Sequence, residues 1–92
     1  MNPKRTKYYP LDGDTIEMRN SLNGSKKVRL AGVNAPELGS RDGNIARAKL
    51  ASLLQGRPIT VEPVARDVYG RTVGIVRVRG KNINNAMKRM GY

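Results

Sequence analysis

The order of apolar and polar residues along the chain predicts mostly short β-strands. Residues 15–19 and 71–79 alternate between the two kinds, as half-buried strands do. In the second of these stretches we expect Val73, Ile75 or Val76, and Val78 to face the core. Three further apolar runs complete the set, and the pattern predicts five strands, at residues 8–11, 15–19, 28–33, 57–64 and 71–79.

Two other stretches have the spacing of amphipathic helices. One apolar stripe follows i, i+4, i+7 and i+8 and consists of Ala46, Leu50, Leu53 and Leu54. We expect Asp42 to cap the start of this helix and Gly56 to end it. A shorter helix is expected after Asn82, which would cap it. Its buried stripe would be Ile83, Met87 and Met90.

Turn signals separate the strands, and the strongest is Asn23–Gly24, a hairpin signal. The resulting order β-β-β-α-β-β-α, with no repeat or linker, favours a small closed barrel, because closure removes free strand edges. We therefore expect an α+β, mainly β fold: a five-stranded Greek-key barrel of the oligonucleotide-binding type with two short helices. Residues 1–92 would form one domain, with residues 1–7 as a loose basic arm.

Charge points to the partner. The chain has 18 Lys and Arg against 7 Asp and Glu, a formal net charge of +11, spread from Lys4 to Arg89. A domain with this charge attracts polyanions, so nucleic acid is the first partner to consider and an acidic membrane surface the second. We expect no membrane span and a monomer. No signal peptide is recognisable, which predicts a cytoplasmic protein if Met1 is the native start and a secreted one if a signal has been removed.

The chain contains no cysteine and no histidine. Thiolate metal sites, disulfides, Ser-His triads and nearly all transition-metal chemistry are thereby excluded. Catalysis would have to use carboxylates, Arg, Lys, Tyr or hydroxyls, and a metal held by oxygen atoms would be a hard cation such as calcium or magnesium.

The stretch from Arg29 to Glu37 concentrates this chemistry. Pro36 cannot donate to a strand ladder, so the strand should end near Val33. Asn34, the Ala35 carbonyl and Glu37 would then be displayed at its end, with Arg29 further back. Such a group suits a metal ion and a phosphate, but a hairpin end with a solvated carboxylate explains the same residues.

Three motifs in register resemble the staphylococcal nuclease (thermonuclease) family. They are Asp12-Gly-Asp-Thr15, the strand and turn from Arg29 to Glu37, and Asp67-Val-Tyr-Gly-Arg71. The tail Gly80-Lys-Asn-Ile-Asn84 and Gly91 also match the family pattern, so the resemblance covers nearly the whole chain. It implies a calcium-dependent phosphodiesterase that cuts DNA and RNA with little sequence preference and leaves a 3′-phosphate and a 5′-hydroxyl.

The resemblance also implies individual roles. Calcium would be bound by three groups, which are the Asp14 carboxylate, the Asn34 side chain and the Ala35 carbonyl. Glu37 would be the base for the attacking water. Arg29 and Arg71 would bind the scissile phosphate and its transition state, and Tyr69 would lie beside the nucleotide phosphate. An Asx turn for Asp12 and Asp14, a solvated Arg71 and a merely packed Tyr69 are the competing structural interpretations.

Two departures from the family pattern matter. Asn34 stands where the family most often has an aspartate, which predicts weaker calcium binding. The chain also stops at Tyr92, before a further tyrosine-bearing segment, so it would be a minimal version or a fragment. The alternative to a nuclease is a module that binds nucleic acid, in particular single strands, without cutting it. Tyr8 and Tyr9 are the sole candidate stacking pair.

Overall fold

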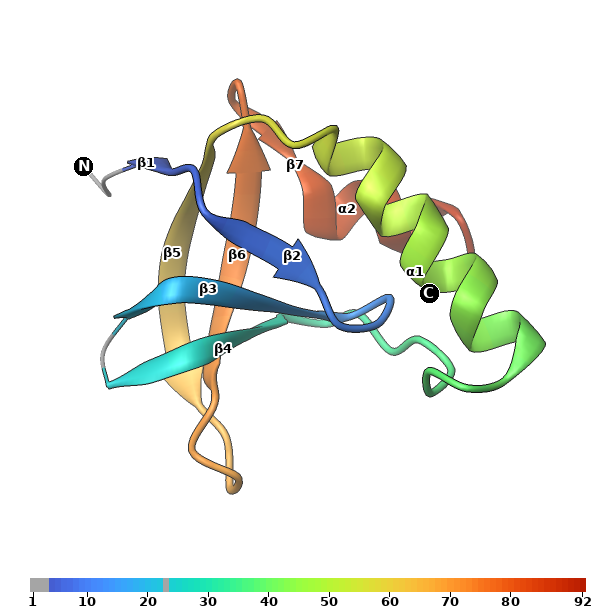
Figure 1. Cartoon of the computed structure of the whole chain (residues 1–92), viewed down its shortest axis with the longest axis horizontal. Coiled ribbons are helices and arrows are strands. Elements are labelled where there is room, and N and C mark those ends of the chain that lie inside the picture. The colour runs from blue at the N-terminus through green and yellow to red at the C-terminus, as the bar shows by residue number, and fades with distance from the viewer. Residues whose placement is uncertain (1–3, 23) are drawn as a thin grey trace.

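In residues 4–22 and 24–92, the part of the chain that the computed structural model describes, seven strands form one curled mixed sheet and two helices lie together on one side of it (Figure 1). The elements are β1 (Lys4–Arg5), β2 (Tyr8–Pro10), β3 (Thr15–Leu22), β4 (Ser25–Leu30), α1 (Arg41–Leu54), β5 (Ile59–Arg66), β6 (Thr72–Val78), β7 (Lys81–Asn82) and α2 (Ile83–Arg89). The architecture is the expected mainly β, oligonucleotide-binding-like barrel. β1 and β7, of two residues each, were not predicted.

The first described segment closes the sheet. β1 pairs with β5 and β2 pairs with β3, so residues 4–10 connect the two ends of the strand order β1-β5-β6-β4-β3-β2. Figure 1 shows this segment crossing from β5 to β3. The expectation of a loose arm is therefore wrong for Lys4 and Arg5, because backbone pairing to Ile59 and Thr60 holds them. Residues 1–3 lie outside the described residues.

The β3–β4 hairpin is present, with Leu22 paired to Ser25; Asn23 itself lies outside the described residues. β3 is longer than expected because a register shift after Glu17 lets it continue to Leu22. β4 ends at Leu30, three residues before the predicted Val33. The chain turns at Gly32, whose φ is +74°, and the Val33 N–H donates to the Leu30 carbonyl.

β6 buries the residues that β-strand alternation allows. Val76 and Val78 are buried as predicted, and Thr72 and Gly74 lie with them. Val73 and Ile75 are only half-buried, so the prediction was wrong for Val73, and of the two alternatives Ile75 and Val76 it is Val76 that faces the core. In a regular strand, a residue at odd separation from Val78 faces the other side of the sheet.

Both helices pack on the barrel core. α1 buries Ala46, Leu50 and Leu54, but its N-cap is Ser40, not Asp42. Asp42 lies instead in the first turn, where a carboxylate favours the helix dipole.

α2 has the predicted cap, since the Asn82 side chain accepts from the Asn85 N–H. Met90 was expected in the core but is 42% exposed, because α2 ends at Arg89 and the chain turns away at Gly91. Among the described residues no helix is long and apolar enough to cross a membrane.

Candidate active site

Asp14 lies in the turn between β2 and β3, and this turn packs against two other segments. The Asp14 N–H donates to Oδ1 of Asp12 at 3.1 Å, so Asp12 forms the Asx-type contact that the structural interpretation anticipated. A Cβ on Gly13 would lie 2.6 Å from the Ala35 Cβ and 2.7 Å from the Ala46 Cβ. Glycine is therefore needed here for the turn to touch both the loop after β4 and helix α1.

The Asp14 carboxylate is largely buried, with its side chain 12% exposed. Oδ1 accepts from the Thr15 hydroxyl at 2.9 Å, and Oδ2 accepts from the Ala35 N–H at 3.0 Å. Burial alone would raise the pKa of Asp14, but these hydrogen bonds, the neighbouring Asp12 and the Arg29 charge together lower it. Burial and the nearby Asp14 raise the pKa of Asp12. Asp14 is thus the more acidic member of the pair.

Arg29 joins Asp14 to the loop after β4. Its Nη2 lies 3.6 Å from Oδ2 of Asp14 and donates to Oδ1 of Asn34 at 2.7 Å. The Asn34 N–H donates to the carbonyl of Tyr92 at 3.1 Å. The structure thus brings together four of the predicted site residues, Asp14, Arg29, Asn34 and Ala35.

A second group forms at the loop between β5 and β6. The Arg71 Nε donates to Oδ2 of Asp67 at 2.7 Å, and the Arg71 N–H donates to Oδ1 at 2.9 Å. The Tyr69 ring is highly exposed, and Cζ of Arg71 lies 5.3 Å from its centroid. Arg71, Tyr69, Lys27 and Glu37 line one open pocket of about 420 Å³. Arg71 is therefore held in place by Asp67 and is no freely solvated arginine.

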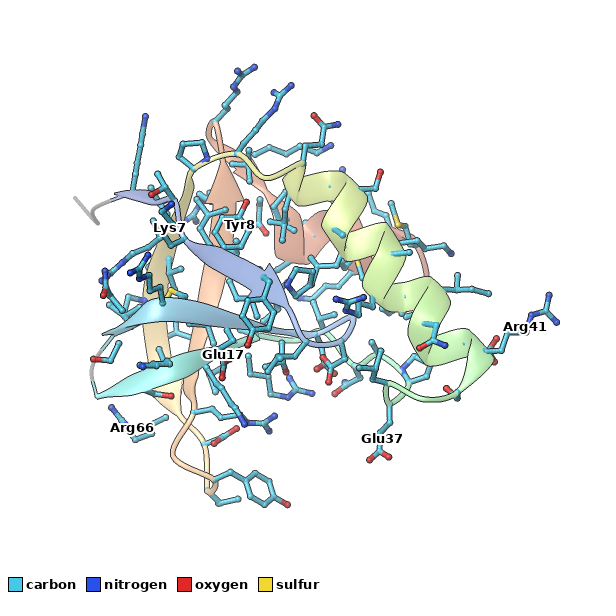
Figure 2. The ribbon with its side chains drawn as sticks, in the orientation of Figure 1. Lys7, Tyr8, Glu17, Glu37, Arg41 and Arg66 are labelled. Atoms are coloured by element: carbon cyan, nitrogen blue, oxygen red, sulfur yellow. The ribbon has the colours of Figure 1, made fainter. Side chains whose placement is uncertain are left out.

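The two groups lie near each other because β4 and β6 are parallel neighbours. Arg29 is opposite Val73 and Val28 is opposite Thr72, so Lys27 lies beside Arg71. Figure 2 shows Glu37 on the loop between β4 and α1, pointing away from the barrel. Within residues 4–22 and 24–92 no hydrogen bond joins its carboxylate to Asp14 or Asn34. Glu37 is thus brought to the Arg71 pocket, and not into the Asp14 hydrogen-bond cluster.

Sequence reasoning missed the residues that position these groups. Asp67 was part of a quoted motif but had no role, although an acid four residues before Arg71 across a glycine turn was an available signal. Ser40 donates to the Glu37 carbonyl at 2.9 Å and accepts from the Gly43 N–H at 2.9 Å. A Cβ on Gly43 would lie 1.7 Å from that carbonyl oxygen. Glycine there lets the start of α1 support the Glu37 loop.

The donor atoms around Asp14 limit what a metal ion could find. Among the described residues no three His, Cys, Asp or Glu side chains cluster. The oxygen atoms that these residues offer are the Asp14 carboxylate, the Asn34 amide oxygen and the Ala35 carbonyl. Ala35 is next to Asp14, because its N–H donates to the Asp14 carboxylate. All are oxygen atoms, so the group fits a hard cation with flexible coordination and does not fit a soft one.

Comparison with known proteins identifies a family. The family model described as staphylococcal nuclease homologue matches residues 27–92. A protein named Uncharacterized endonuclease from Escherichia coli O157:H7 is 39% identical over 82 residues, which are 88% of this chain and 53% of that protein. Micrococcal nuclease of Shigella flexneri is 42% identical over 66 residues, 72% of this chain and 37% of that protein.

The chain thus spans about half the length of the first of these relatives and less of the second. The family match covers the strands and loops that carry Arg29, Asn34, Glu37 and Arg71. The Asp14 turn lies before the range of the family model. The chain belongs to the staphylococcal nuclease homologue family.

Proposed function

We propose that this domain is a calcium-dependent endonuclease that hydrolyses phosphodiester bonds of DNA and RNA, with little sequence preference, to 3′-phosphate and 5′-hydroxyl products. One observation carries the proposal. Arg29 on β4 and Arg71, directly before the parallel neighbour β6, are each paired with a carboxylate and lie beside a group of oxygen atoms and an exposed Glu37. The nuclease names of the relatives agree with it.

The arginines would bind the phosphate. Asp67 engages Nε and the N–H of Arg71, and no hydrogen bond to another described residue uses its Nη groups, which could therefore donate into the pocket that Glu37 also lines. Arg29 would approach the same phosphate from β4. Guanidinium groups in fixed positions stabilise the negative charge that develops on the phosphoryl oxygens in the transition state.

Glu37 would take the proton of the attacking water. Glu37 is exposed and is one of the residues that line the pocket, and Ser40 fixes the backbone that carries it. Attack on phosphorus would form the bond to the water oxygen and break the bond to the 5′ oxygen, which would take a proton from solvent and leave as the 5′-hydroxyl. Calcium, held by Asp14, Asn34 and the Ala35 carbonyl, would neutralise phosphate charge and make bound water more acidic. Tyr69 would pack beside the nucleotide.

Binding without cleavage is the second candidate, and one observation favours it. Both Asp14 oxygens and the Asn34 amide oxygen already accept hydrogen bonds, and the Asn34 oxygen is paired with Arg29 at 2.7 Å. A cation would have to displace Arg29 from Asn34. If it cannot, the same basic face would bind phosphate but lack a metal.

Incubation of labelled single-stranded DNA and RNA with the protein, in calcium, in magnesium or with chelator, tests the proposal. We expect cleavage in calcium, slow cleavage in magnesium and none with chelator, since the donors suit a large, flexible ion. Arg71→Ala should lower the rate on the order of 10²-fold or more. Arg41→Ala is the matched control, because Arg41 is exposed at the start of α1, away from the site (Figure 2).

Three results would contradict the proposal. They are cleavage that survives chelation, equal rates in calcium and magnesium, and Arg71→Ala as active as Arg41→Ala. Binding in all conditions with no cleavage in any would establish the second candidate. End-group analysis of the fragments checks the 3′-phosphate.

A further inference from the structure

The two tyrosines of the Tyr8–Tyr9 pair have different environments. Tyr8 is half-buried, packs against the core and donates its hydroxyl to the Arg57 carbonyl. Tyr9 is 50% exposed, and its hydroxyl donates to the Glu17 carboxylate. Tyr8 therefore has a structural role, and of the two tyrosines Tyr9 is the one whose ring is more exposed to solvent.

Tyr9 lies on a row of residues that ends at the candidate active site. Strand register places Tyr9 opposite Glu17 and Glu17 opposite Lys27, and Lys27 lies beside Arg71. Residues directly opposite each other in neighbouring strands share a face. Three strand spacings separate Tyr9 from Arg71, or about 14 Å at about 4.8 Å each. The outer face is thus continuous from the Arg71 pocket to Tyr9.

Basic residues accompany Tyr9 on this face. The Arg19 N–H donates to the Lys7 carbonyl at 2.9 Å, so Lys7 and Arg19 form the next cross-strand pair after Tyr9 and Glu17. A hollow of about 450 Å³ lies here, lined among others by Lys7, Tyr9, Glu17, Arg19 and Lys26. Lys7 and Glu17 are labelled in Figure 2. Three of these five residues are cationic and one is anionic.

We propose that this surface binds unpaired nucleotides that flank the bond to be cut. We call it the β2–β3 face, and it consists of Lys7 directly before β2, Tyr9 on β2, Arg19 on β3 and the neighbouring Lys26 on β4. Tyr9 stacks on a base, and the cations contact phosphates on either side of it. This inference rests on the proposed function, because it extends the path of a strand whose scissile phosphate lies at Arg29 and Arg71.

The chemistry of the face fits a single strand better than a duplex. Stacking on Tyr9 needs a base whose face is free, and it accepts any base. The bond from Tyr9 to Glu17 restrains the ring, so less freedom is lost when a base packs on it. Glu17 itself repels phosphate, and the three cations outweigh it.

Binding is measured by fluorescence anisotropy in chelator, with a labelled thymidine strand of about eight nucleotides, a length within the range that such barrels bind, and with a thymidine dinucleotide. Tyr9→Ala should weaken binding of the longer strand roughly tenfold, and Tyr9→Phe should retain most of it. The dinucleotide, too short to reach from Arg71 to Tyr9, should be bound equally by all three proteins. Glu17→Gln should bind the longer strand more tightly.

Charge-matched double variants test the phosphate contacts. Lys7→Gln with Arg19→Gln removes two cations from the β2–β3 face, whereas Lys81→Gln with Arg89→Gln removes two exposed cations from β7 and α2. The first double variant should weaken binding of the longer strand more than the second double variant does. An eight-pair duplex should not be affected by Tyr9→Ala.

Three results would overturn the inference. The first is a Tyr9→Ala variant that binds the longer strand within twofold of the parent at an unchanged melting temperature. The others are equal losses of affinity in the two double variants, or a Tyr9→Ala variant that loses as much affinity for the duplex as for the single strand. Because chelator prevents cleavage, these outcomes are independent of the proposed function. A parent protein that never cuts but binds through Tyr9 would refute the function alone. An active protein indifferent to Tyr9 would refute the inference alone.

Discussion

At the scale of single residues, the contacts that Arg29 makes in the structure compete with its proposed binding of phosphate. Its Nη2 is the hydrogen-bond donor to Asn34 and the nearest cation to Asp14. The same guanidinium is proposed to bind phosphate, and the same Asn34 oxygen is proposed to bind calcium. Ligand binding would therefore exchange the Arg29–Asn34 contact for an Arg29–phosphate and an Asn34–calcium contact. The charge of the side chain at position 34 therefore affects the free energy of that exchange.

Asn34→Asp should lower the calcium concentration that gives half-maximal cleavage, by about tenfold. A carboxylate adds a full negative charge at ligand distance, worth about 1 to 4 kcal/mol depending on the local dielectric. A stronger ion pair with Arg29 offsets part of this gain. The measurement is a calcium titration of cleavage at fixed ionic strength, and the rate advantage should shrink or reverse once calcium is saturating.

Asn85→Asp is the matched control for that titration, since it adds the same charge at an exposed position on α2. If Asn34→Asp and Asn85→Asp shift the calcium dependence equally, the effect is one of net charge, and Asn34 does not bind the ion. An unchanged midpoint in Asn34→Asp leads to the same conclusion.

Contacts between residues close in sequence were predictable at this scale, and contacts between residues far apart in sequence were not. Arg29, Asn34 and Ala35 belong to one strand and turn, so their meeting follows from local geometry. Asp14 joins them through pairing of β3 with β4, which the hairpin signal indicated. The link from Tyr9 to Glu17 depends on the register of two strands, and the sequence pattern did not fix that register.

At the scale of elements, the loop between β5 and β6 is organised by one carboxylate. Asp67 accepts from the N–H groups of Tyr69 and Arg71 and from the Arg71 guanidinium. Desolvation by the loop raises the pKa of Asp67, but these donors outweigh it and hold the pKa below its ordinary value. The loop that presents Arg71 and Tyr69 therefore depends on the ionised form of Asp67.

Asp67→Asn should be less stable than the parent near neutral pH, and this difference in stability should disappear as the pH falls. A lowered folded-state pKa means that Asp67 stabilises the fold fully above its unfolded pKa of about 3.9 and ceases to do so as the pH falls through the lowered folded value. The gap in urea midpoint between the parent and Asp67→Asn should thus be largest near neutral pH and should narrow below about pH 4. A gap that stays constant from pH 6 to pH 3 would contradict this.

Helix α2 is fastened to the barrel by Asn84. Its buried side chain accepts from the Val76 N–H and donates to the carbonyls of Ala31 and Gly74, each at 3.0 Å. Asn84→Ala should lower the free energy of unfolding by about 2 to 4 kcal/mol, because the Val76 N–H and the carbonyls of Ala31 and Gly74 each lose a hydrogen-bond partner.

Asn85→Ala is the control, since Asn85 is exposed and the change should stay within about 0.5 kcal/mol. Urea denaturation of both variants is the measurement. A loss below about 1 kcal/mol for Asn84→Ala would show that water replaces these bonds.

Element positions followed from the sequence better than element boundaries. Strong alternation located β6, yet both Val73 and Val78 were assigned to the core because apolar residues occupy both faces of that strand. Asp42 was predicted as the N-cap, but the cap is Ser40, whose side chain accepts from the Gly43 N–H, and the sequence pattern does not fix that backbone geometry. The pairing of Lys4 with Thr60 spans most of the chain, and no local pattern predicts it.

At the scale of the whole molecule, the charge is large and poorly neutralised. The net charge is +11, and within residues 4–22 and 24–92 three ion pairs form, Arg29–Asp14, Arg71–Asp67 and Arg77–Glu62. Unpaired cations on a barrel of this size repel one another and attract phosphate. Nucleic acid and salt should therefore compete for the same surface.

Affinity for single-stranded DNA should fall steeply with salt and vary little with sequence. If about five phosphates are neutralised, the slope of log affinity against log salt is about −3.5, so a fourfold increase in salt weakens binding on the order of 10². No base-reading motif is present, so strands of different sequence should bind within about tenfold of each other. Anisotropy titrations in chelator from 50 to 200 mM salt, on two unrelated sequences, measure both quantities.

Lys7→Gln should make the slope of log affinity against log salt shallower by about 0.7 if Lys7 contacts a phosphate. A slope near zero, or a preference well beyond tenfold, would show that contacts to bases and not to phosphates carry the affinity.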